Sequence, residues 1–547
     1  MAQPFELSDE EPRVARFQAD GAWRFPHSFH ARPLLGTLPD GGHLKWVCWA
    51  MAGRVKRDLV SVDVDRLGNE AVSACAQRDR GNQARRRASP SIPVVEHLPV
   101  EIGAAESQRI AALARKLLAD EPVLRSTEPF GSNVSPGLGS WPSLVLEDHS
   151  GISLYDPEQE AAYAYRALLL AGEGDQVVIG VRRSPAFERY CAEVLRLGAV
   201  DILTASAAWR HRSLAARCLR DPALLERVAR YARAAGGLNL LPYMGTGGVW
   251  ALAGAIAARS GVEVRVGAPP PRLTRRVNGK LWFAERVAEV LGRRALPPAY
   301  PAFSLWALTR RVLVLAKRHA SVAVKLPDSA SSLGNFVFES ESLLRLPSLR
   351  VLDRLRDALH GAGWRGRFPL LVTGWEQPVA TNPSVQLWIP DSTAGPPLVE
   401  GVFEQHLAGE AGLFAGAAPS DLPLGWQRRL AVEASRLASL FQDLGYFGRC
   451  SCDAILVGDW SRRPFVVVDR RTAEPGPERE FAEFLQEIDG DLFAPGVRDT
   501  GAVALAPGRI EAGTGLALMI IGETAEAART QAQQIATKFS RNSSAGR

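Results

Sequence analysis

The sequence predicts an α/β and α+β multidomain protein, in which a doubly wound domain with a mostly parallel sheet precedes two α+β subdomains. The chain has 547 residues, which is too long for one hydrophobic core and indicates about three or four domains. Apolar runs alternate with segments of helical periodicity from Ser143 to Gly267, which is typical of a parallel sheet. With 46% hydrophobic and 23% charged residues, the composition is that of an ordinary globular protein.

The segments before Ser143 are less regular. Leu44–Asp65 predicts one or two strands joined by a glycine-containing turn, and Glu106–Leu118 has the apolar spacing of a helix. The Gly-, Ser- and Pro-rich stretch Phe130–Pro142 marks a boundary or a loop.

Strands and helices then alternate. The expected strands are LVLED, DQVVIGV, LNLLPYM and VEVRVG, and the expected helices are 158–172, 186–198, 219–235 and 249–260. The runs VVIG (177–180) and LNLLPY (238–243) are almost continuously apolar, so we expect them to be neighbouring strands buried on both faces.

From Lys317 onward two α+β subdomains are expected, as the family resemblance given below implies. Arg429–Leu444 is an amphipathic helix that leads into a Gly-Tyr-Phe-Gly turn. The last segment is expected to be a strand followed by a helix beginning at Thr524, with a disordered tail.

Composition also limits the function and the compartment. No run of 18 apolar residues is present, the first residues have no apolar core of a signal peptide, and six scattered cysteines indicate neither a disulfide framework nor a zinc ribbon. We therefore expect a cytoplasmic protein with no membrane partner. The net charge of +6 comes mainly from arginine, and the densest basic run, Arg78–Arg87, lacks interleaved aromatic residues, so nucleic acid is disfavoured as a partner.

The segment Ser321–Asn335, SVAVKLPDSASSLGN, carries the first functional signal. Lys325 ends a β-branched run and is followed by a loop of small polar residues, among them Ser331, Ser332, Gly334 and Asn335. Backbone N–H groups of such a loop can converge on phosphate oxygens while the ammonium supplies a point charge. The alternative is a surface hairpin, because many strands end in a turn of this composition.

Several later motifs follow in a fixed order. They are NPSVQ (382–386), VFEQHLAG (402–409), GYFGRCSCD (445–453) and FVVVDRR (465–471). Together with the Lys325 loop, this series resembles the ATP-grasp superfamily, and most closely its pheganomycin-type peptide ligases. Upstream, YRALLLAG, VVIG, RCLRDPALLERV and LNLLPYMGT resemble the pre-ATP-grasp domain of those ligases.

The resemblance implies a domain organisation and a reaction. It implies an unassigned region at 1–125, a pre-ATP-grasp domain at 126–290, an ATP-grasp domain at 291–485 and a small C-terminal domain at 486–547. ATP-grasp ligases activate a carboxylate as an acylphosphate, which an amine then attacks. The cofactors would be ATP and Mg²⁺, and the substrates an amino-acid or peptide carboxylate and an amine, in peptide natural-product biosynthesis. The oligomeric state stays open, with a homodimer as one possibility.

The resemblance also assigns roles to individual residues. It implies that Lys325 and its loop contact the phosphates and that Glu376 lies in the hinge that binds adenine, although Glu376 could equally be a solvated loop acid. The catalytic candidates are Arg276, Lys280, Gln386 and Arg471. Arg276 and Lys280 fall where the family has lysine and arginine, so the geometry of this basic pair cannot be the same.

The metal site departs from the family pattern, which has an aspartate followed by a strand reading E-I-N-x-R. Asp453 supplies the aspartate. Aligning the strand on Arg471 places Val467 at the glutamate and Asp469 at the asparagine, whereas sliding by two residues places Asp469 at the glutamate. Either way one oxygen ligand for Mg²⁺ is lost. Glu339, Glu341 or Glu404 could restore it.

Two hypotheses follow from this departure. The first is an amide-forming ligase with an altered metal shell, in which Asp453 and Asp469 hold Mg²⁺. The second is a non-catalytic ATP-grasp protein that binds nucleotide weakly or serves as a partner in a pathway. Other ATP-driven carboxylate chemistry is a third, less favoured interpretation.

Overall fold

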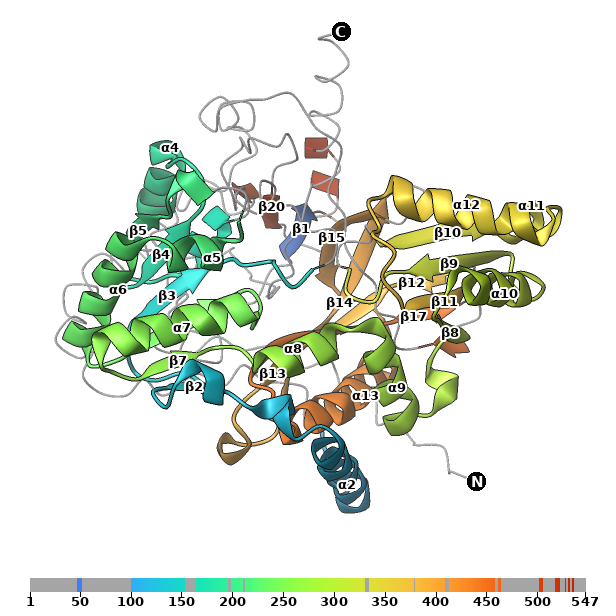
Figure 1. Ribbon diagram of the computed structural model, residues 1–547, viewed down its shortest axis with the longest axis horizontal. Helices are drawn as coiled ribbons and strands as arrows, with labels where there is room; N and C mark the ends of the chain where they lie inside the picture. The colour runs from blue at the N-terminus through green and yellow to red at the C-terminus, as the bar shows by residue number, and fades with distance from the viewer. Residues whose placement is uncertain are drawn as a thin grey trace, which may run out of the picture.

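A computed structural model describes the chain in three sheet-based units (Figure 1). The described residues are 47–51, 100–152, 164–194, 198–209, 212–329, 334–377, 379–408, 413–420, 422–457, 461–463, 501–504 and 517–521, with five single positions between 527 and 535. Within these residues, no helix combines the length and the apolar character that crossing a bilayer requires.

The first unit is a six-stranded parallel sheet. Its strand order is β2-β7-β6-β3-β4-β5, with every pair parallel. The strands are β2 (Val134–Pro136), β3 (Ser143–Leu146), β4 (Gln176–Ile179), β5 (Asp201–Thr204), β6 (Leu238–Pro242) and β7 (Val264–Val266). The chain moves outward from β3 to β5 in one direction and from β6 to β7 in the other, so right-handed crossovers place helices on both faces. The predicted doubly wound domain is confirmed.

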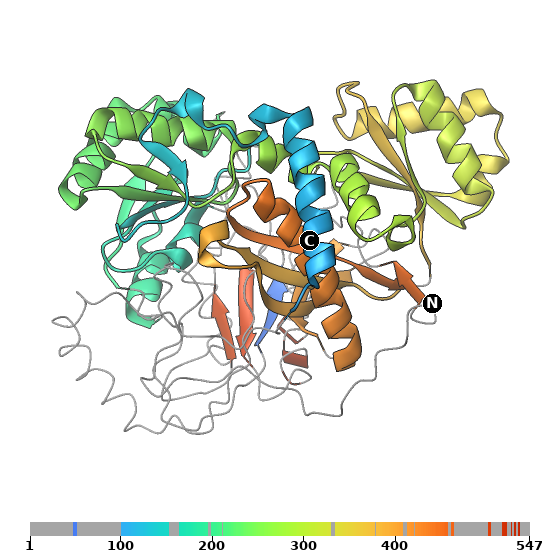
Figure 2. The same cartoon turned by 90° about the horizontal axis from the view of Figure 1, so that it is seen from below.

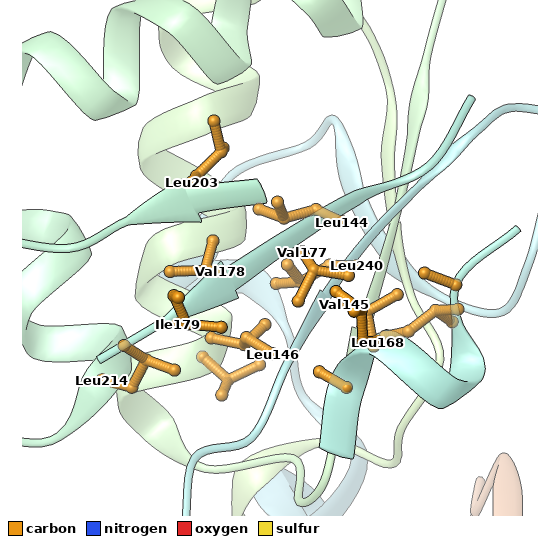
Figure 3. Close-up of a cluster of buried hydrophobic side chains, with 14 of the residues drawn as sticks. Leu144, Val145, Leu146, Leu168, Val177, Val178, Ile179, Leu203, Leu214 and Leu240 are labelled. Carbon is orange, nitrogen blue, oxygen red and sulfur yellow. The ribbon is translucent and has the colours of Figure 1, made fainter. Parts of the chain in front are cut away.

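One detail of this prediction is wrong. The runs VVIG and LNLLPY are strands β4 and β6 of one sheet, but β3 lies between them and pairs with both. Continuous apolar character indicates burial on both faces and carries no information on strand order. Figure 3 shows the leucine, valine and isoleucine side chains of this sheet packed in its core, where residues such as Val177 and Leu240 are fully buried.

The helices of this unit begin at polar caps. The side chains of Ser184, Ser213, Asp221 and Thr246 each accept a backbone N–H at the start of a helix, which satisfies a donor that has no partner inside the helix. The helices are α4 (Pro185–Arg189), α5 (Leu214–Leu219), α6 (Pro222–Ala235) and α7 (Gly247–Ser260). Of the helix expected at 158–172, the described part is a 3₁₀ helix at Ala164–Leu170, and α4 continues as one π-helical turn at Tyr190–Val194.

Arg217 joins the carboxyl ends of β4 and β5. Its guanidinium, buried with the rest of the side chain, donates to the carbonyl oxygens of Gly180, Ala205 and Ser206 at 2.7–3.2 Å. Because Arg217→Met leaves these carbonyls without that donor, we expect it to lower the free energy of unfolding by about 3 kcal/mol. Urea denaturation measures the change. The exposed Arg220→Met is the control, and an equal loss in both variants would contradict the assigned role.

The second unit is a four-stranded antiparallel sheet with helices on one face (Figure 1). The strand order is β10-β9-β11-β8, and the strands are β8 (Ala299–Ala302), β9 (Ser321–Lys325), β10 (Asn335–Glu339) and β11 (Leu370–Trp375). Residues such as Val322, Val324 and Val372 point toward the helices α10 (Leu305–Ala316), α11 (Ser340–Leu344) and α12 (Ser348–Gly361). Since side chains alternate along a strand, Ala323, Lys325 and Thr373 point to the other face.

The third unit is a seven-stranded sheet of order β16-β13-β14-β15-β1-β20-β19. Its strands are β1 (Val47–Met51), β13 (Pro383–Ile389), β14 (Leu398–Ala408), β15 (Leu413–Pro419), β16 (Gly448–Asp453), β19 (Gly501–Ala504) and β20 (Ala517–Ile521). A separate three-stranded sheet has the order β12-β17-β18, with β12 at Val379–Thr381, β17 at Ile455–Val457 and β18 at Ser461–Arg463. In the chain, β12 comes just before β13, and β17 comes just after β16.

Four helices share the core of the third unit. These are α2 (Ala104–Asp120), α8 (Pro271–Asn278), α9 (Lys280–Val290) and α13 (Leu424–Asp443). Figure 2 shows α2 lying along α13, and Arg436 of α13 approaches Glu106 of α2 at 3.7 Å. Elements from outside residues 291–485 also join this unit, namely β1, α2, α8, α9, β19 and β20.

Candidate active site

The loop after β9 begins and ends next to two polar side chains, Lys325 and Asn335. Lys325 and Asn335 are directly opposite each other in the β9–β10 pair, on the face of the four-stranded sheet that carries no helices. The Lys325 side chain is 4% exposed, and its ammonium lies 5.5 Å from the centre of the Trp375 ring on β11. A cation held over an indole face is stabilised by the ring quadrupole. This placement supports a functional loop over an ordinary surface hairpin.

Lys280 reaches the same loop from the first turn of α9. Its ammonium donates to the carbonyl oxygen of Ser329, and its distance to the Ser329 hydroxyl oxygen is 3.1 Å. Gly334 closes the loop, because a Cβ at this position would lie 2.1 Å from the Ser329 hydroxyl oxygen. The structure thus brings Lys325, Lys280, Gly334 and Asn335 together.

A second polar group lies on the seven-stranded sheet. Gln386 of β13 donates to the Ser384 hydroxyl at 3.0 Å, and that hydroxyl donates to the Asp453 carboxylate of β16 at 2.7 Å. Ser384 pairs with Asp453 and Gln386 with Ser451, so these side chains share one face. The predicted residues Gln386 and Asp453 are therefore neighbours, and Ser384 joins them.

This polar face is turned toward the parallel-sheet unit. Val385 and Leu387 of β13 pack with α13 on one face, so Ser384 and Gln386 point to the other. Phe403, opposite Ser384 in the β13–β14 pair, belongs to the core cluster of the parallel sheet. The face that bears Asp453 thus lies on the same side as the first unit.

The Gly-Tyr-Phe-Gly turn positions β16. Gly445 and Gly448 have φ values of +92° and +114°, which glycine adopts without the strain that a side chain would cause. Between them, Tyr446 donates its hydroxyl to the Arg449 carbonyl at 2.9 Å. Burial raises the pKa of Tyr446 well above its usual range, so the phenol stays a donor. Arg449 in turn holds Glu400 of β14 by two N–H groups at 3.0 Å.

The other predicted site residues are placed differently. Arg276, whose side chain is 48% exposed, forms an ion pair with Glu121 at 2.9 Å, so the structure does not show it beside Lys280 at the loop. Glu376 directly follows Trp375 at the end of β11 and is half-buried. Ser331, Ser332, Val467, Asp469 and Arg471 lie outside the described residues.

The described residues offer Mg²⁺ one predicted carboxylate, Asp453. No group of three His, Cys, Asp or Glu side chains in the described part of the chain could hold a metal. Glu404 accepts hydrogen bonds from Thr381 and Ser420, and strand alternation places it on the face opposite Asp453. Glu341 pairs with Arg345 on α11. Hard oxygen donors at Asp453 and Gln386 suit Mg²⁺ only together with further oxygen ligands, such as phosphate.

Three residues of this arrangement were not predicted from the sequence. Ser384 lies two residues before Gln386, so strand alternation could have placed it on the same face. Ser329 belongs to the small-residue loop already singled out. Trp375 immediately precedes Glu376, but nothing in the sequence indicates that it meets Lys325, because that contact joins strands 50 residues apart.

Comparison with known proteins gives one match to a family model. Residues 164–258 match the pre ATP-grasp domain, which places the likeness on the parallel sheet from the 3₁₀ helix to α7. The predicted pre-ATP-grasp likeness is confirmed for this part of the chain, whereas the pheganomycin-type assignment stays a prediction. No curated protein sequence matches the chain.

Among solved structures, the chain is similar to N5-carboxyaminoimidazole synthase from Aspergillus clavatus, with 13% identity, a TM-score of 0.43 and coverage of 74% of this chain and 99% of that one. Biotin carboxylase from Campylobacter jejuni has 12% identity and a TM-score of 0.42, and the match covers 71% of this chain and 89% of that one. D-alanyl-alanine synthetase A from Vibrio cholerae has 10% identity and a TM-score of 0.35, and the match covers 62% of this chain and 90% of that one. With TM-scores below 0.5, these likenesses do not define the chemistry of this chain.

Proposed function

We propose that the chain is an ATP-dependent carboxylate–amine ligase that acts through an acylphosphate on amino-acid or peptide substrates. The observation that carries the proposal is the placement of Lys325. Its buried ammonium lies on the helix-free face of the four-stranded sheet, beside a loop of small residues whose root is fixed by Lys280. The order of the sequence motifs and the pre-ATP-grasp match support the same proposal.

In this proposal the nucleotide would lie along the strands of the helix-free face. The phosphates would lie at the loop beside Lys325, and the base near Trp375 and Glu376.

The polar face of the seven-stranded sheet would supply the remaining chemistry. Asp453 would bind Mg²⁺ together with phosphate oxygens, and Mg²⁺ would neutralise charge that develops during phosphoryl transfer. Gln386 can donate to the substrate carboxylate or hold Asp453 through Ser384. Most of the rate enhancement would come from positioning and electrostatics, since phosphoryl transfer needs little covalent help from the protein.

Release of ADP in the presence of candidate acids and amines tests the proposal directly. We expect ADP only when Mg²⁺, an amino-acid or peptide carboxylate and an amine are all present, together with a product that contains a new amide bond. ADP release that never depends on an acid and an amine would contradict ligase activity.

One observation favours a second function, a nucleotide-binding protein without turnover. In the described part of the chain only Asp453 stands at a predicted metal position, and Val467 occupies the family glutamate position in one of the two alignments. Titration calorimetry of ATP with and without Mg²⁺ separates the two functions. Affinity that increases with Mg²⁺ supports the ligase, whereas weak binding that ignores Mg²⁺ supports the second function.

Trp375 provides a further test of the nucleotide face. Trp375→Leu removes the ring that holds the Lys325 ammonium in place before nucleotide binds. The cation–π contact contributes about 0.5–2 kcal/mol, so we expect loss of this preorganisation to lower ATP affinity by at most about 30-fold. Trp375→Phe keeps an aromatic face and should retain most of the affinity. If both variants lose the same ATP affinity, the size of the Trp375 side chain matters and its aromatic character does not.

A further inference from the structure

The Lys280 side chain is enclosed by the protein. It is 1% exposed, although lysine is among the residues most rarely buried. Its ammonium is held by the carbonyl and hydroxyl oxygens of Ser329, and its backbone N–H donates to the Pro327 carbonyl at 3.0 Å. Because both of these contacts are with the loop itself, Lys280 acts on the position of the loop.

Lys280 binds the first part of the loop after Lys325, residues 326–329, which is called the root of the loop. Ser329 donates its hydroxyl to the Leu326 carbonyl at 2.9 Å, and the Leu326 N–H donates to the Gly334 carbonyl at 2.8 Å. Gly334 packs so closely on Ser329 that only glycine fits. The Leu326–Gly334 hydrogen bond therefore joins the two ends of the loop, Ser329 binds Leu326, and Lys280 binds Ser329.

The helix that carries Lys280 belongs to a different unit from the loop. Phe283, Val287 and Val290 of α9 lie in the core cluster of the seven-stranded sheet. The Phe283 ring lies 6.3 Å from that of Phe441 on α13, the helix that packs under β13. Lys280 thus joins the loop of the four-stranded sheet to the body that carries Asp453.

We propose that Lys280 is a positioning residue, which fixes the loop after Lys325 at a set place relative to Asp453 and does not itself contact nucleotide or substrate. This inference rests on the proposed function, since the loop is taken to bind phosphates. It replaces the catalytic role that the family resemblance implied for Lys280.

The test combines nucleotide binding with hydrogen exchange in Lys280→Met. By titration calorimetry we expect ATP and ADP to bind at least about 10-fold more weakly, while AMP changes by less than about 2-fold, because only the outer phosphates depend on the loop. Without nucleotide, amides at 326–329 should exchange faster in the variant, and those of β13 and β16 should not. Lys317→Met, at an exposed lysine that follows α10, is the control for loss of a positive charge.

Each other outcome contradicts the inference in its own way. Weaker ATP binding with unchanged exchange at 326–329 would show that Lys280 contacts the nucleotide directly. Equal loss of ATP and AMP, with faster exchange throughout, would show a general structural role. Unchanged ATP affinity would show that the loop does not need this anchor. If the unaltered protein binds no ATP, the proposed function fails, and this inference fails with it.

Ser329→Ala keeps the test valid if Lys280→Met does not fold. This change removes the hydroxyl but leaves the carbonyl that Lys280 also binds. We expect a smaller loss of ATP affinity, about 2- to 5-fold, again with AMP unaffected. A loss that is equal for ATP and AMP would overturn the positioning role.

Discussion

Lys325→Met should lower ATP affinity by about 10- to 150-fold and leave the fold intact. A charge-assisted hydrogen bond to phosphate contributes about 1.5–3 kcal/mol, and methionine cannot form it. The fold should survive because the side chain is buried against Trp375 and an unbranched apolar chain of similar length fills the same space. Titration calorimetry measures the affinity, and thermal melting measures the stability.

The matched control for this change is Lys317→Met. Lys317 is exposed and belongs to the same unit, so both variants lose one positive charge. An unchanged dissociation constant in Lys325→Met, or the same weakening in both variants, would show that Lys325 does not contact the phosphates.

Asp453→Asn should reduce Mg²⁺-dependent turnover by about 100-fold or more. The loss follows because metal-ion stabilisation of developing charge contributes several kcal/mol to phosphoryl transfer, and a neutral amide binds Mg²⁺ far less well than a carboxylate. The amide oxygen can still accept the Ser384 hydroxyl at the place where the carboxylate accepts it at 2.7 Å, so folding should not change. The rate of ADP release at increasing Mg²⁺ measures the effect.

Asp357→Asn, at an exposed aspartate of α12, controls for the loss of a carboxylate. High Mg²⁺ should recover part of the activity of Asp453→Asn, since weaker coordination is overcome by mass action. Full activity at low Mg²⁺ would remove Asp453 from the metal site. A large fall in melting temperature would instead give it a structural role in the hydrogen-bond chain with Gln386 and Ser384.

Local patterns predicted the elements of this protein well. The parallel strands β3, β4, β6 and β7 were predicted from apolar runs, and the helices α2, α7 and α13 from apolar spacing. These signals are reliable because periodicity follows directly from the geometry of one helix or strand. The four-residue strand β5 was not predicted, since DILT is only half-buried at an edge of the sheet and so lacks a continuous apolar run.

The sequence by itself determined the doubly wound domain, and it singled out the Lys325 loop, Asp453 and Gln386 as candidate site residues. Only the tertiary structure decided which of these residues meet. The contacts of Lys280 with Ser329, of Lys325 with Trp375 and of Asp453 with Ser384 join residues 49, 50 and 69 positions apart. It also decided that Arg276 pairs with Glu121. The Lys280 contact depends on how two units pack, and those of Lys325 and Asp453 depend on which strands pair within a sheet. No local propensity or spacing records either arrangement.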